Sequence, residues 1–306
     1  MIKILKGIYA ATVVPLNKDK SIDKKSLNEH VKNIINTEGI KGLLINGHAG
    51  ENFTLSGEEQ IEVVRVAKKY KKKNKKIISG LNFEDPTFAS KVARNMEKAG
   101  ADAILIFPPF SWSQGVSSDM IYEHHKTICN HTKKPVFLYQ SSIYSGHLSY
   151  KKETLKKLLK IKNISGVKEG SWDYKSYVSN YIFFKKYRKN FLVMASGDEH
   201  LYPCFKYKSD GTQVSIAAVV PEKVVELIKK IKQKKYLEAK LVDKKLLVLA
   251  KNIYGKYPQN FATARIKYCL KILKKIPNEI MKSSIILDNN EKKQLKKSLK
   301  FLGLKF

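Results

Sequence analysis

Residues 76–109, KIISGLNFEDPTFASKVARNMEKAGADAILIFPP, carry the pattern that decides the fold. Two apolar runs, KIISGLN (76–82) and ADAILIFPP (101–109), enclose a segment that begins with Asp85-Pro86. Asp followed by Pro is typical of a helix start, because the carboxylate caps free N–H groups and Pro fits the first helical position. Continuous apolar runs of this length suit strands that are buried on both faces of a parallel sheet. The stretch therefore predicts a strand–helix–strand unit.

The same pattern recurs through residues 7–220 at intervals of roughly 30 residues, the size of one strand–helix unit. The other runs are GIYAATVVP (7–15), GLLINGH (42–48), PVFLYQ (135–140), ISGVKEG (164–170), FLVMASGD (191–198) and TQVSIAAVV (212–220). Asp23, and Ser56 with Glu59, provide further helix-start signals between the runs. Eight such units predict an α/β protein with a (β/α)8 TIM barrel, and an open doubly wound sheet is the alternative. The count of eight favours the barrel, and no GxGxxG sequence follows any run.

After Pro221 the pattern becomes purely helical, with expected helices at 221–255, about 259–275 and 290–302. We therefore expect a barrel over residues 1–220 and a C-terminal helical region over residues 221–306 that packs on it. No low-complexity linker separates the two regions.

The chain of 306 residues has a formal net charge of +32, which raises the question of a nucleic-acid partner. Four of its 59 basic residues are arginines: Arg65, Arg94, Arg188 and Arg265. Proteins that read bases or clamp phosphates favour Arg for its planar fork, whereas these lysines are spread over nearly every expected helix. We expect a solvated lysine-rich surface without a specific nucleic-acid partner. A basic binding module without catalysis is the remote alternative.

Other features concern the location of the protein in the cell. No segment approaches about 18 uncharged apolar residues, so we expect no membrane span, and the N-terminus does not resemble a signal peptide. The three cysteines, Cys129, Cys204 and Cys269, lie far apart and fit neither a disulfide framework nor a zinc site. A cytoplasmic protein without a metal is therefore expected.

Lys168 is the first candidate for chemistry, because barrels carry their active sites at the C-terminal ends of the strands. The rest of ISGVKEG (164–170) is small or apolar except for Glu169, so the lysine side chain is expected to point into the barrel mouth. Desolvation there lowers the pKa of a lysine, and its neutral amine can attack a carbonyl group. The alternatives are a lysine that reaches solvent and a lysine that pairs with Glu169.

Three other positions at strand ends are candidates. Tyr139 ends the run 135–140 and is either a proton shuttle or a core tyrosine. The glycines of residues 47–50 allow backbone N–H groups to cradle an anion, although a simple turn has the same sequence. Asp198 is expected to cap a helix rather than to bind a metal with Glu199 and His200, because three consecutive residues cannot all face one point.

Taken in this order, these motifs resemble those of the dihydrodipicolinate synthase / N-acetylneuraminate lyase family of class I aldolases, and the resemblance runs through the whole chain. The motifs are Gly47-His48-Ala49-Gly50-Glu51, Tyr139, Gly166-Val167-Lys168-Glu169 and Ser196-Gly197-Asp198, followed by the apolar eighth run.

The resemblance implies a mechanism and an assembly. Lys168 would form an imine, or Schiff base, with the C2 carbonyl of pyruvate or another 2-keto acid, and Tyr139 would relay protons. The backbone of residues 47–50 would hold the keto-acid carboxylate, with Gly197 and Val214 lining the pocket. No cofactor or metal is implied. The family usually assembles as a homotetramer, a dimer of dimers.

Several positions depart from the usual family pattern. His48 and Ala49 replace two hydroxyl residues, and His48 is expected to hydrogen-bond Tyr139 and to titrate near neutral pH. Phe110 stands where the synthase has a second tyrosine. Tyr144 stands where the synthase has an arginine that grips the carboxylate of the second substrate.

These departures disfavour the synthesis of dihydrodipicolinate itself. Together with Trp172, they predict a less charged acceptor side. We expect a class I aldolase-type lyase that forms or cleaves a C–C bond beside a keto-acid imine. A dehydratase or deaminase that works through the same imine is the alternative.

Overall fold

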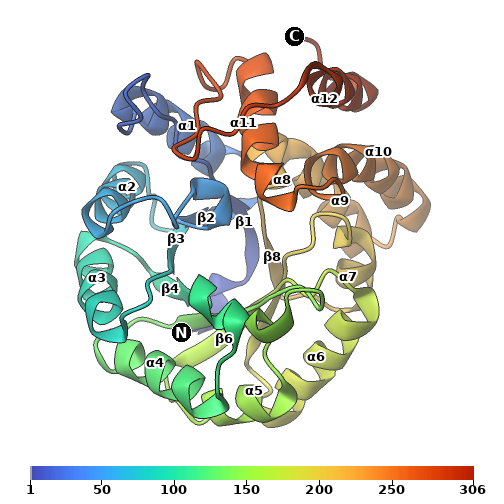
Figure 1. Cartoon of the computed structure of the whole chain (residues 1–306). Coiled ribbons are helices and arrows are strands. Elements are labelled where there is room, and N and C mark those ends of the chain that lie inside the picture. Colours follow the sequence, from blue (N-terminus) through green and yellow to red (C-terminus); the bar gives the residue numbers. More distant parts are fainter. Residues whose placement is uncertain (1) are drawn as a thin grey trace.

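Eight parallel strands close into a barrel in the computed structural model, which describes residues 2–306 (Figure 1). The strands are β1 (Gly7–Ala11), β2 (Ile40–Ile45), β3 (Lys76–Leu81), β4 (Ala103–Ile106), β5 (Val136–Gln140), β6 (Ile164–Glu169), β7 (Leu192–Ala195) and β8 (Gly211–Val214). They are ordered around the barrel as in the sequence, and β8 pairs with β1. The predicted (β/α)8 barrel is thereby confirmed, and an open sheet is excluded.

Helices cover the outside of the barrel and extend beyond it on one side (Figure 1). They are α1 (Lys24–Asn36), α2 (Gly57–Lys69), α3 (Pro86–Ala99), α4 (Ser118–Asn130), α5 (Lys152–Leu158), α6 (Tyr174–Tyr187), α7 (Leu201–Tyr207), α8 (Ile216–Val219), α9 (Pro221–Lys232), α10 (Tyr236–Tyr254), α11 (Ala262–Ile272) and α12 (Asn289–Phe301). Short 3₁₀ helices are η1 (Ile2–Leu5), η2 (His48–Gly50), η3 (Phe110–Gln114), η4 (Gly146–Leu148) and η5 (Gln259–Phe261).

The helix-start signals of the sequence act as expected. The Asp23 side chain accepts a hydrogen bond from the N–H of Ser26. The Asp85 side chain accepts one from the N–H of Thr87, and Pro86 is the first residue of α3. Ser56 and Glu59 form a complete capping box at the start of α2. These bonds satisfy N–H groups that have no partner inside their helix, so each helix begins at a defined residue.

The apolar core has two layers, because successive residues of a strand point to opposite faces. An inner cluster fills the barrel and includes Tyr9, Leu44, Phe107 and Met194. A larger outer cluster lies between the barrel and its helices. A residue near the end of a strand therefore points either toward the barrel axis and mouth or toward the helices, and this alternation positions the site.

Two predicted elements differ from the structure. The run 212–220 is not one strand, since β8 ends at Val214 and residues 216–219 form α8. The buried carboxylate of Asp198 accepts a hydrogen bond from the N–H of Ile216 at 2.7 Å, which stabilises this helix start. The predicted helix 221–255 is two helices, because Lys234 adopts a left-handed conformation with φ of 61° between α9 and α10.

The C-terminal helices pack on one side of the barrel (Figure 1). Helix α9 contacts both α7 and α10, and α11 contacts η2 in the loop after β2. The division at residue 220 stays a prediction, since α9 contacts elements on both sides of it. Among residues 2–306, no helix is long and apolar enough to cross a membrane. Cys129, Cys204 and Cys269 are all buried and free.

Candidate functional site

Lys168 and Tyr139 lie side by side at the C-terminal ends of β6 and β5. They are register partners, so both side chains point to the same face of the barrel wall. The Nζ atom of Lys168 lies 5.3 Å from the ring centre of Tyr139 and 5.4 Å from that of Phe107. Both side chains are only 8% exposed, which excludes a lysine that extends into solvent.

Glu169 points away from this pair. Its carboxylate accepts hydrogen bonds from Asn180 at 2.7 Å and from Ser171 at 3.1 Å, on the outer side of the barrel. Adjacent residues of a strand face opposite sides, so Glu169 cannot neutralise Lys168. Within residues 2–306, no carboxylate forms a salt bridge with the Lys168 ammonium.

Burial sets the protonation of the pair. Desolvation lowers the pKa of Lys168 to about 8, with the nearby charge of Asp198 acting in the opposite direction. Desolvation also raises the pKa of Tyr139 to about 12. Near neutral pH, a useful fraction of Lys168 is therefore a free amine, while Tyr139 is a neutral phenol that can donate a proton.

The loop after β2 begins with η2 and presents backbone N–H groups. Its internal hydrogen bonds use the N–H groups of Gly50, Glu51 and Asn52, which bond to the carbonyls of Gly47 and His48. The N–H groups of His48 and Ala49 have no hydrogen-bond partner in the described part of the chain. Two adjacent unpaired N–H groups are a recurrent way to bind an anion.

Close packing explains one of the loop glycines. A Cβ at Gly50 would lie 3.2 Å from the carbonyl oxygen of Thr12, whereas one at Gly47 would make ordinary contacts of 3.5 Å with Leu44. Neither glycine is left-handed. Asn46 and Glu51, with φ of 52° and 54°, make the left-handed turns on either side of the loop. Gly50 is thus needed for space rather than for its backbone angles.

His48 is packed among aromatic rings. Its ring centre lies 4.3 Å from that of Phe107, 5.7 Å from Phe110 and 5.6 Å from Tyr139. Its Nε2 atom is buried and has no hydrogen-bond partner in the described residues, so the expected hydrogen bond to Tyr139 is not formed through that atom. Desolvation and the charge of Lys168 lower the pKa of His48 to about 3. The expected titration near neutral pH is therefore wrong, because burial among these rings and the nearby Lys168 charge both disfavour the imidazolium.

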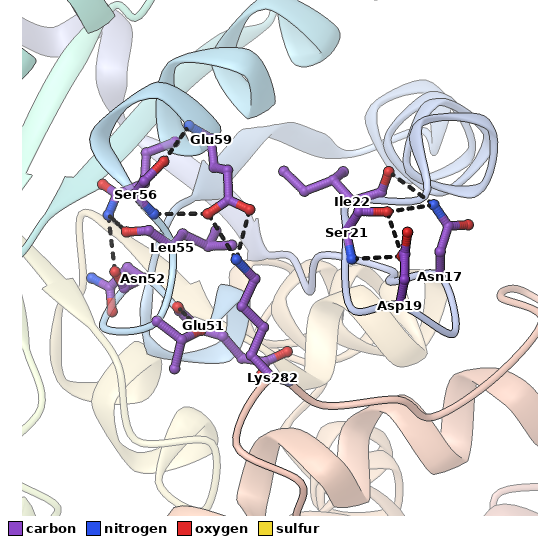
Figure 2. Close-up of polar contacts among 12 residues, drawn as sticks. Asn17, Asp19, Ser21, Ile22, Glu51, Asn52, Leu55, Ser56, Glu59 and Lys282 are labelled. Atoms are coloured by element: carbon purple, nitrogen blue, oxygen red, sulfur yellow. Dashed lines mark hydrogen bonds and ion pairs between the residues drawn. The ribbon is translucent and has the colours of Figure 1, made fainter.

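Ion pairs from the C-terminal region fix the other end of the loop. The buried ammonium of Lys267 on α11 bonds to Oε1 of Glu51, and the backbone N–H of Lys282 bonds to Oε2 at 3.0 Å. Figure 2 shows the Lys282 side chain reaching the carboxylate of Glu59 at the start of α2, with distances of 2.6 and 2.8 Å. The loop that offers free N–H groups is thus tied to residues more than 200 positions away.

A cavity of about 540 Å³ opens above these groups at the barrel mouth. Its lining residues are His48, Ala49, Phe53, Phe110, Tyr139, Ser141, Ser142, Tyr144, Ser145, Leu148, Trp172, Glu199, Tyr254, Gly255, Gln259, Asn260, Ala262 and Thr263. Six residues singled out from the sequence are in this set: His48, Ala49, Phe110, Tyr139, Tyr144 and Trp172. Lys168 itself is not in this set, but Tyr139, whose ring centre lies 5.3 Å from the Lys168 Nζ, is.

Besides Lys168, four expected site residues do not line the cavity. Gly47 and Gly50 form the interior of the loop, and Gly197 is packed against the His200 ring. Val214 belongs to the outer core cluster, since its register partner Ala10 also faces the helices. The side chain of Val214 therefore points away from the barrel mouth, contrary to its expected place in the pocket.

Asp198 is buried beside the site. Its Oδ1 accepts hydrogen bonds from the N–H of Ile216 and from the hydroxyl of Ser215, at 2.7 and 3.4 Å. Desolvation raises the pKa of Asp198 to about 7, against the lowering effects of these bonds and of Lys168. Its side chain thus acts at the start of α8, as a cap supplied from the end of β7. Among residues 2–306, no cluster of His, Cys, Asp and Glu is arranged to hold a metal ion.

Sequence reasoning missed one side of the cavity, which comes from the C-terminal region. Tyr254 ends α10, and its hydroxyl is hydrogen-bonded to that of Ser215. The Tyr254 ring lies 5.0 Å from the Trp172 ring, and Thr263 donates a hydrogen bond to the carbonyl of His48. Tyr254 is one of 16 tyrosines and stands in no motif, so nothing local in the sequence marks it.

Comparisons with known proteins show what the chain as a whole is similar to. The model of the dihydrodipicolinate synthetase family matches residues 4–302. A 4-hydroxy-tetrahydrodipicolinate synthase from Chlorobium phaeobacteroides is 27% identical over 99% of each chain. A dihydrodipicolinate synthase structure from Agrobacterium tumefaciens superposes with a TM-score of 0.88 at 20% identity, covering 98% of this chain and 99% of that one. An N-acetylneuraminate lyase structure from Fusobacterium nucleatum gives 0.83 at 23%, covering 97% and 98%. At these identities the two structures show the same fold.

Proposed function

Because the chain belongs to the dihydrodipicolinate synthetase family, whose members are class I aldolase-type lyases, we propose that it acts on pyruvate or a related 2-keto acid through a Schiff base on Lys168. The observation that carries the proposal is the buried Nζ of Lys168, 5.3 Å from the ring centre of Tyr139 at the barrel mouth. A desolvated amine beside a neutral phenol is the pair that imine chemistry requires.

The proposed reaction begins with attack of the neutral Lys168 amine on the C2 carbonyl. Tyr139 donates a proton to the hydroxyl of the resulting carbinolamine, which leaves as water, and the cationic imine remains. The Tyr139 phenolate then takes a proton from C3, the imine accepts the electron pair of that C–H bond, and an enamine forms. In the cleavage direction the imine accepts the electron pair of the C3–C4 bond instead. Attack of the enamine on an aldehyde makes a new C–C bond, and the reverse sequence cleaves one.

The carboxylate of the keto acid is proposed to bind at the loop after β2. The free N–H groups of His48 and Ala49 support this assignment, since they are adjacent and close to the His48 ring that faces Tyr139. No metal or cofactor is part of the proposal. His48 stays neutral in this scheme, because desolvation and the charge of Lys168 lower its pKa to about 3.

The acceptor side is proposed to bind an uncharged, hydroxylated aldehyde. No arginine or lysine lines the described cavity, and Ser141, Gln259 and Asn260 provide neutral hydrogen-bonding groups. The buried Oε1 of Glu199 is a further acceptor without a partner in residues 2–306. A second carboxylate on the substrate would face Glu199 rather than a cation, which disfavours aspartate semialdehyde as the acceptor.

We also propose a homotetramer in a reducing compartment such as the cytoplasm. The rings of Phe53 and Phe110 at the cavity rim are 43% and 45% exposed, which suits a contact with a second copy. The three buried free cysteines suit reducing conditions. Light scattering on the purified chain tests the assembly, and a monomer at all concentrations would contradict it.

Trapping of the imine tests the central proposal. Incubation with pyruvate followed by borohydride should give a reduced pyruvyl adduct by mass spectrometry, with the modified peptide containing Lys168. Lys168→Ala should give no adduct, whereas Lys152→Ala, on the outer side of the same wall, should label normally. An adduct that persists in the Lys168 variant would contradict the assignment of the nucleophile.

The alternative reaction through the same imine is loss of water or ammonia from the substrate. It is separated by measuring products. Condensation of pyruvate with glycolaldehyde or D-glyceraldehyde supports the aldol reaction. Release of water or ammonia from a hydroxy- or amino-substituted 2-keto acid, without aldehyde formation, supports the alternative.

A further inference from the structure

Three side chains, from the ends of β7 and β8 and from α10, form a continuous hydrogen-bonded line into the cavity. The Tyr254 hydroxyl contacts the Ser215 hydroxyl, and Ser215 donates to Oδ1 of Asp198 at 3.4 Å. Ser215 and Asp198 are 3% and 5% exposed, while Tyr254 lines the cavity. The line thus runs from an interior carboxylate to a phenol at the surface of the cavity.

The direction of these hydrogen bonds determines which way a proton can move along the line. Because Ser215 donates its proton to Asp198, the Ser215 oxygen accepts the proton of Tyr254. The remaining lone pair of the Tyr254 oxygen is then available to the cavity as an acceptor. Such an arrangement removes a proton from a bound hydroxyl and delivers it to a carboxylate that is shielded from water.

Tyr139 already has a separate task in the proposed reaction. Tyr139 lies beside the Lys168 nitrogen, where imine formation requires it, and its neighbours in the loop and after β4 are Ala49 and Phe110, without hydroxyls. The Tyr254 line comes from β8, the end of β7 and α10. Its residues therefore come from elements other than β5, which carries Tyr139.

We propose that Tyr254 is the catalytic acid–base group for the oxygen of the acceptor, with Ser215 and Asp198 as its positioning residues. This inference rests on the proposed Schiff-base function. In the cleavage direction, Tyr254 takes the proton of the C4 hydroxyl and passes its own proton to Ser215, which passes one to Asp198. The C3–C4 bond breaks, its electron pair moves through the enamine to the imine nitrogen, and C4 leaves as an aldehyde. Condensation returns the proton along the same line.

Two half-reactions separate Tyr254 from Tyr139. Exchange of the pyruvate methyl protons with deuterated water, followed by NMR, requires the imine and enamine but no acceptor. Condensation of pyruvate with glycolaldehyde, D-glyceraldehyde or D-erythrose requires the acceptor oxygen as well. Tyr254→Phe should lower condensation by about 100-fold and exchange by less than about threefold, the range expected for one acid–base group.

Matched variants sharpen the comparison. Tyr139→Phe should slow exchange and condensation together. Ser215→Ala should show the same split as Tyr254→Phe, because it interrupts the line without touching the substrate. Tyr150→Phe is the control, since Tyr150 has a buried hydroxyl without a partner in the described residues and does not line the cavity. It should change neither rate by more than about twofold.

Each result bears on a different statement. Loss of exchange in the wild-type chain, together with failure of imine trapping, would overturn the proposed function itself. Suppose that the wild-type chain exchanges normally but that Tyr254→Phe lowers the exchange rate and the condensation rate equally. This result would overturn the relay and leave the Schiff base in place. Normal condensation in Tyr254→Phe would do the same. Wild-type exchange without condensation with any of the three aldehydes would also overturn the relay, because an acceptor oxygen is its only substrate.

Discussion

Tyr139 and Lys168 occupy paired positions on β5 and β6, and the lysine nitrogen lies 5.3 Å from the centre of the tyrosine ring. Parallel register therefore places an amine and a phenol together without any contribution from a flexible loop. Both residues are 8% exposed, so desolvation shifts the pKa values of the amine and the phenol away from their values in water. The predictions below follow from this pair and from the groups that surround it.

The pH dependence of imine formation should follow the Lys168 amine. Its pKa is lowered from the usual value to about 8, so the reactive neutral form grows as pH rises through 8. The rate of imine formation with pyruvate should rise about tenfold per pH unit well below pH 8 and level off above it. Stopped-flow measurements across pH 6 to 10 check this.

Asp198 should set the position of that pH profile. Its negative charge raises the pKa of Lys168, so Asp198→Asn removes a stabilising partner of the ammonium and should shift the inflection to lower pH. Glu199→Gln is the control, because Glu199 is adjacent in sequence but has no resolved effect on Lys168. An unchanged or higher inflection in the Asp198 variant would contradict the coupling.

Gly50 should be more sensitive than Gly47 to an added methyl group. The Cβ of Gly50→Ala would be 3.2 Å from the carbonyl oxygen of Thr12, so the loop must shift by a few tenths of an ångström. We expect the KM for pyruvate to rise about tenfold, equivalent to about 1.4 kcal/mol, with a smaller change in kcat. Gly47→Ala meets only ordinary contacts and should raise KM by less than about twofold. Equal effects would argue against a cradle formed by this loop.

The pair between Lys267 and Glu51 should contribute to stability more than a surface pair does. Both side chains are almost fully buried, so Lys267→Met leaves a carboxylate without its ammonium and should cost about 3–5 kcal/mol of unfolding free energy. Lys157→Met breaks the exposed pair with Asp119 and should cost less than about 1 kcal/mol. Urea unfolding followed by circular dichroism measures both.

The double variant Glu51→Gln with Lys267→Met distinguishes a lost ion pair from a general packing defect. It removes the unpaired charge, so its loss of stability should be smaller than the sum of the two single losses. Additive losses would mean that the buried charge is not the cause.

Tyr144 should be a place where acceptor preference can be changed. It lines the cavity and is 87% exposed, so a longer basic side chain fits without repacking the core. Tyr144→Arg should raise condensation of pyruvate with an aldehyde that carries a carboxylate, relative to D-glyceraldehyde, by about tenfold or more. Tyr144→Gln is the uncharged control and should not. A preference that does not change in the Arg variant would mean that the acceptor does not extend toward this position.

Local sequence patterns were sufficient to predict the barrel and to bring Lys168 and Tyr139 forward as candidates. Buried parallel strands need continuous apolar runs, and helices need caps, so both leave local patterns such as KIISGLN (76–82) and Asp85-Pro86. Lys168 was identifiable because a lysine interrupts a short strand that is otherwise largely apolar. Its partner Tyr139 ends the preceding strand, where a parallel register brings strand ends together.

The surroundings of Lys168 and Tyr139 depend on contacts between segments that are far apart in the sequence. Tyr254 and Lys267 come from helices that follow the eighth strand, and they reach the site because the chain folds back over the barrel mouth. His48 stays neutral because three aromatic rings from separate segments surround it, and Val214 faces outward because of its register with β1. Local patterns record what one segment buries, whereas desolvation and hydrogen bonds between distant segments depend on how all of them pack.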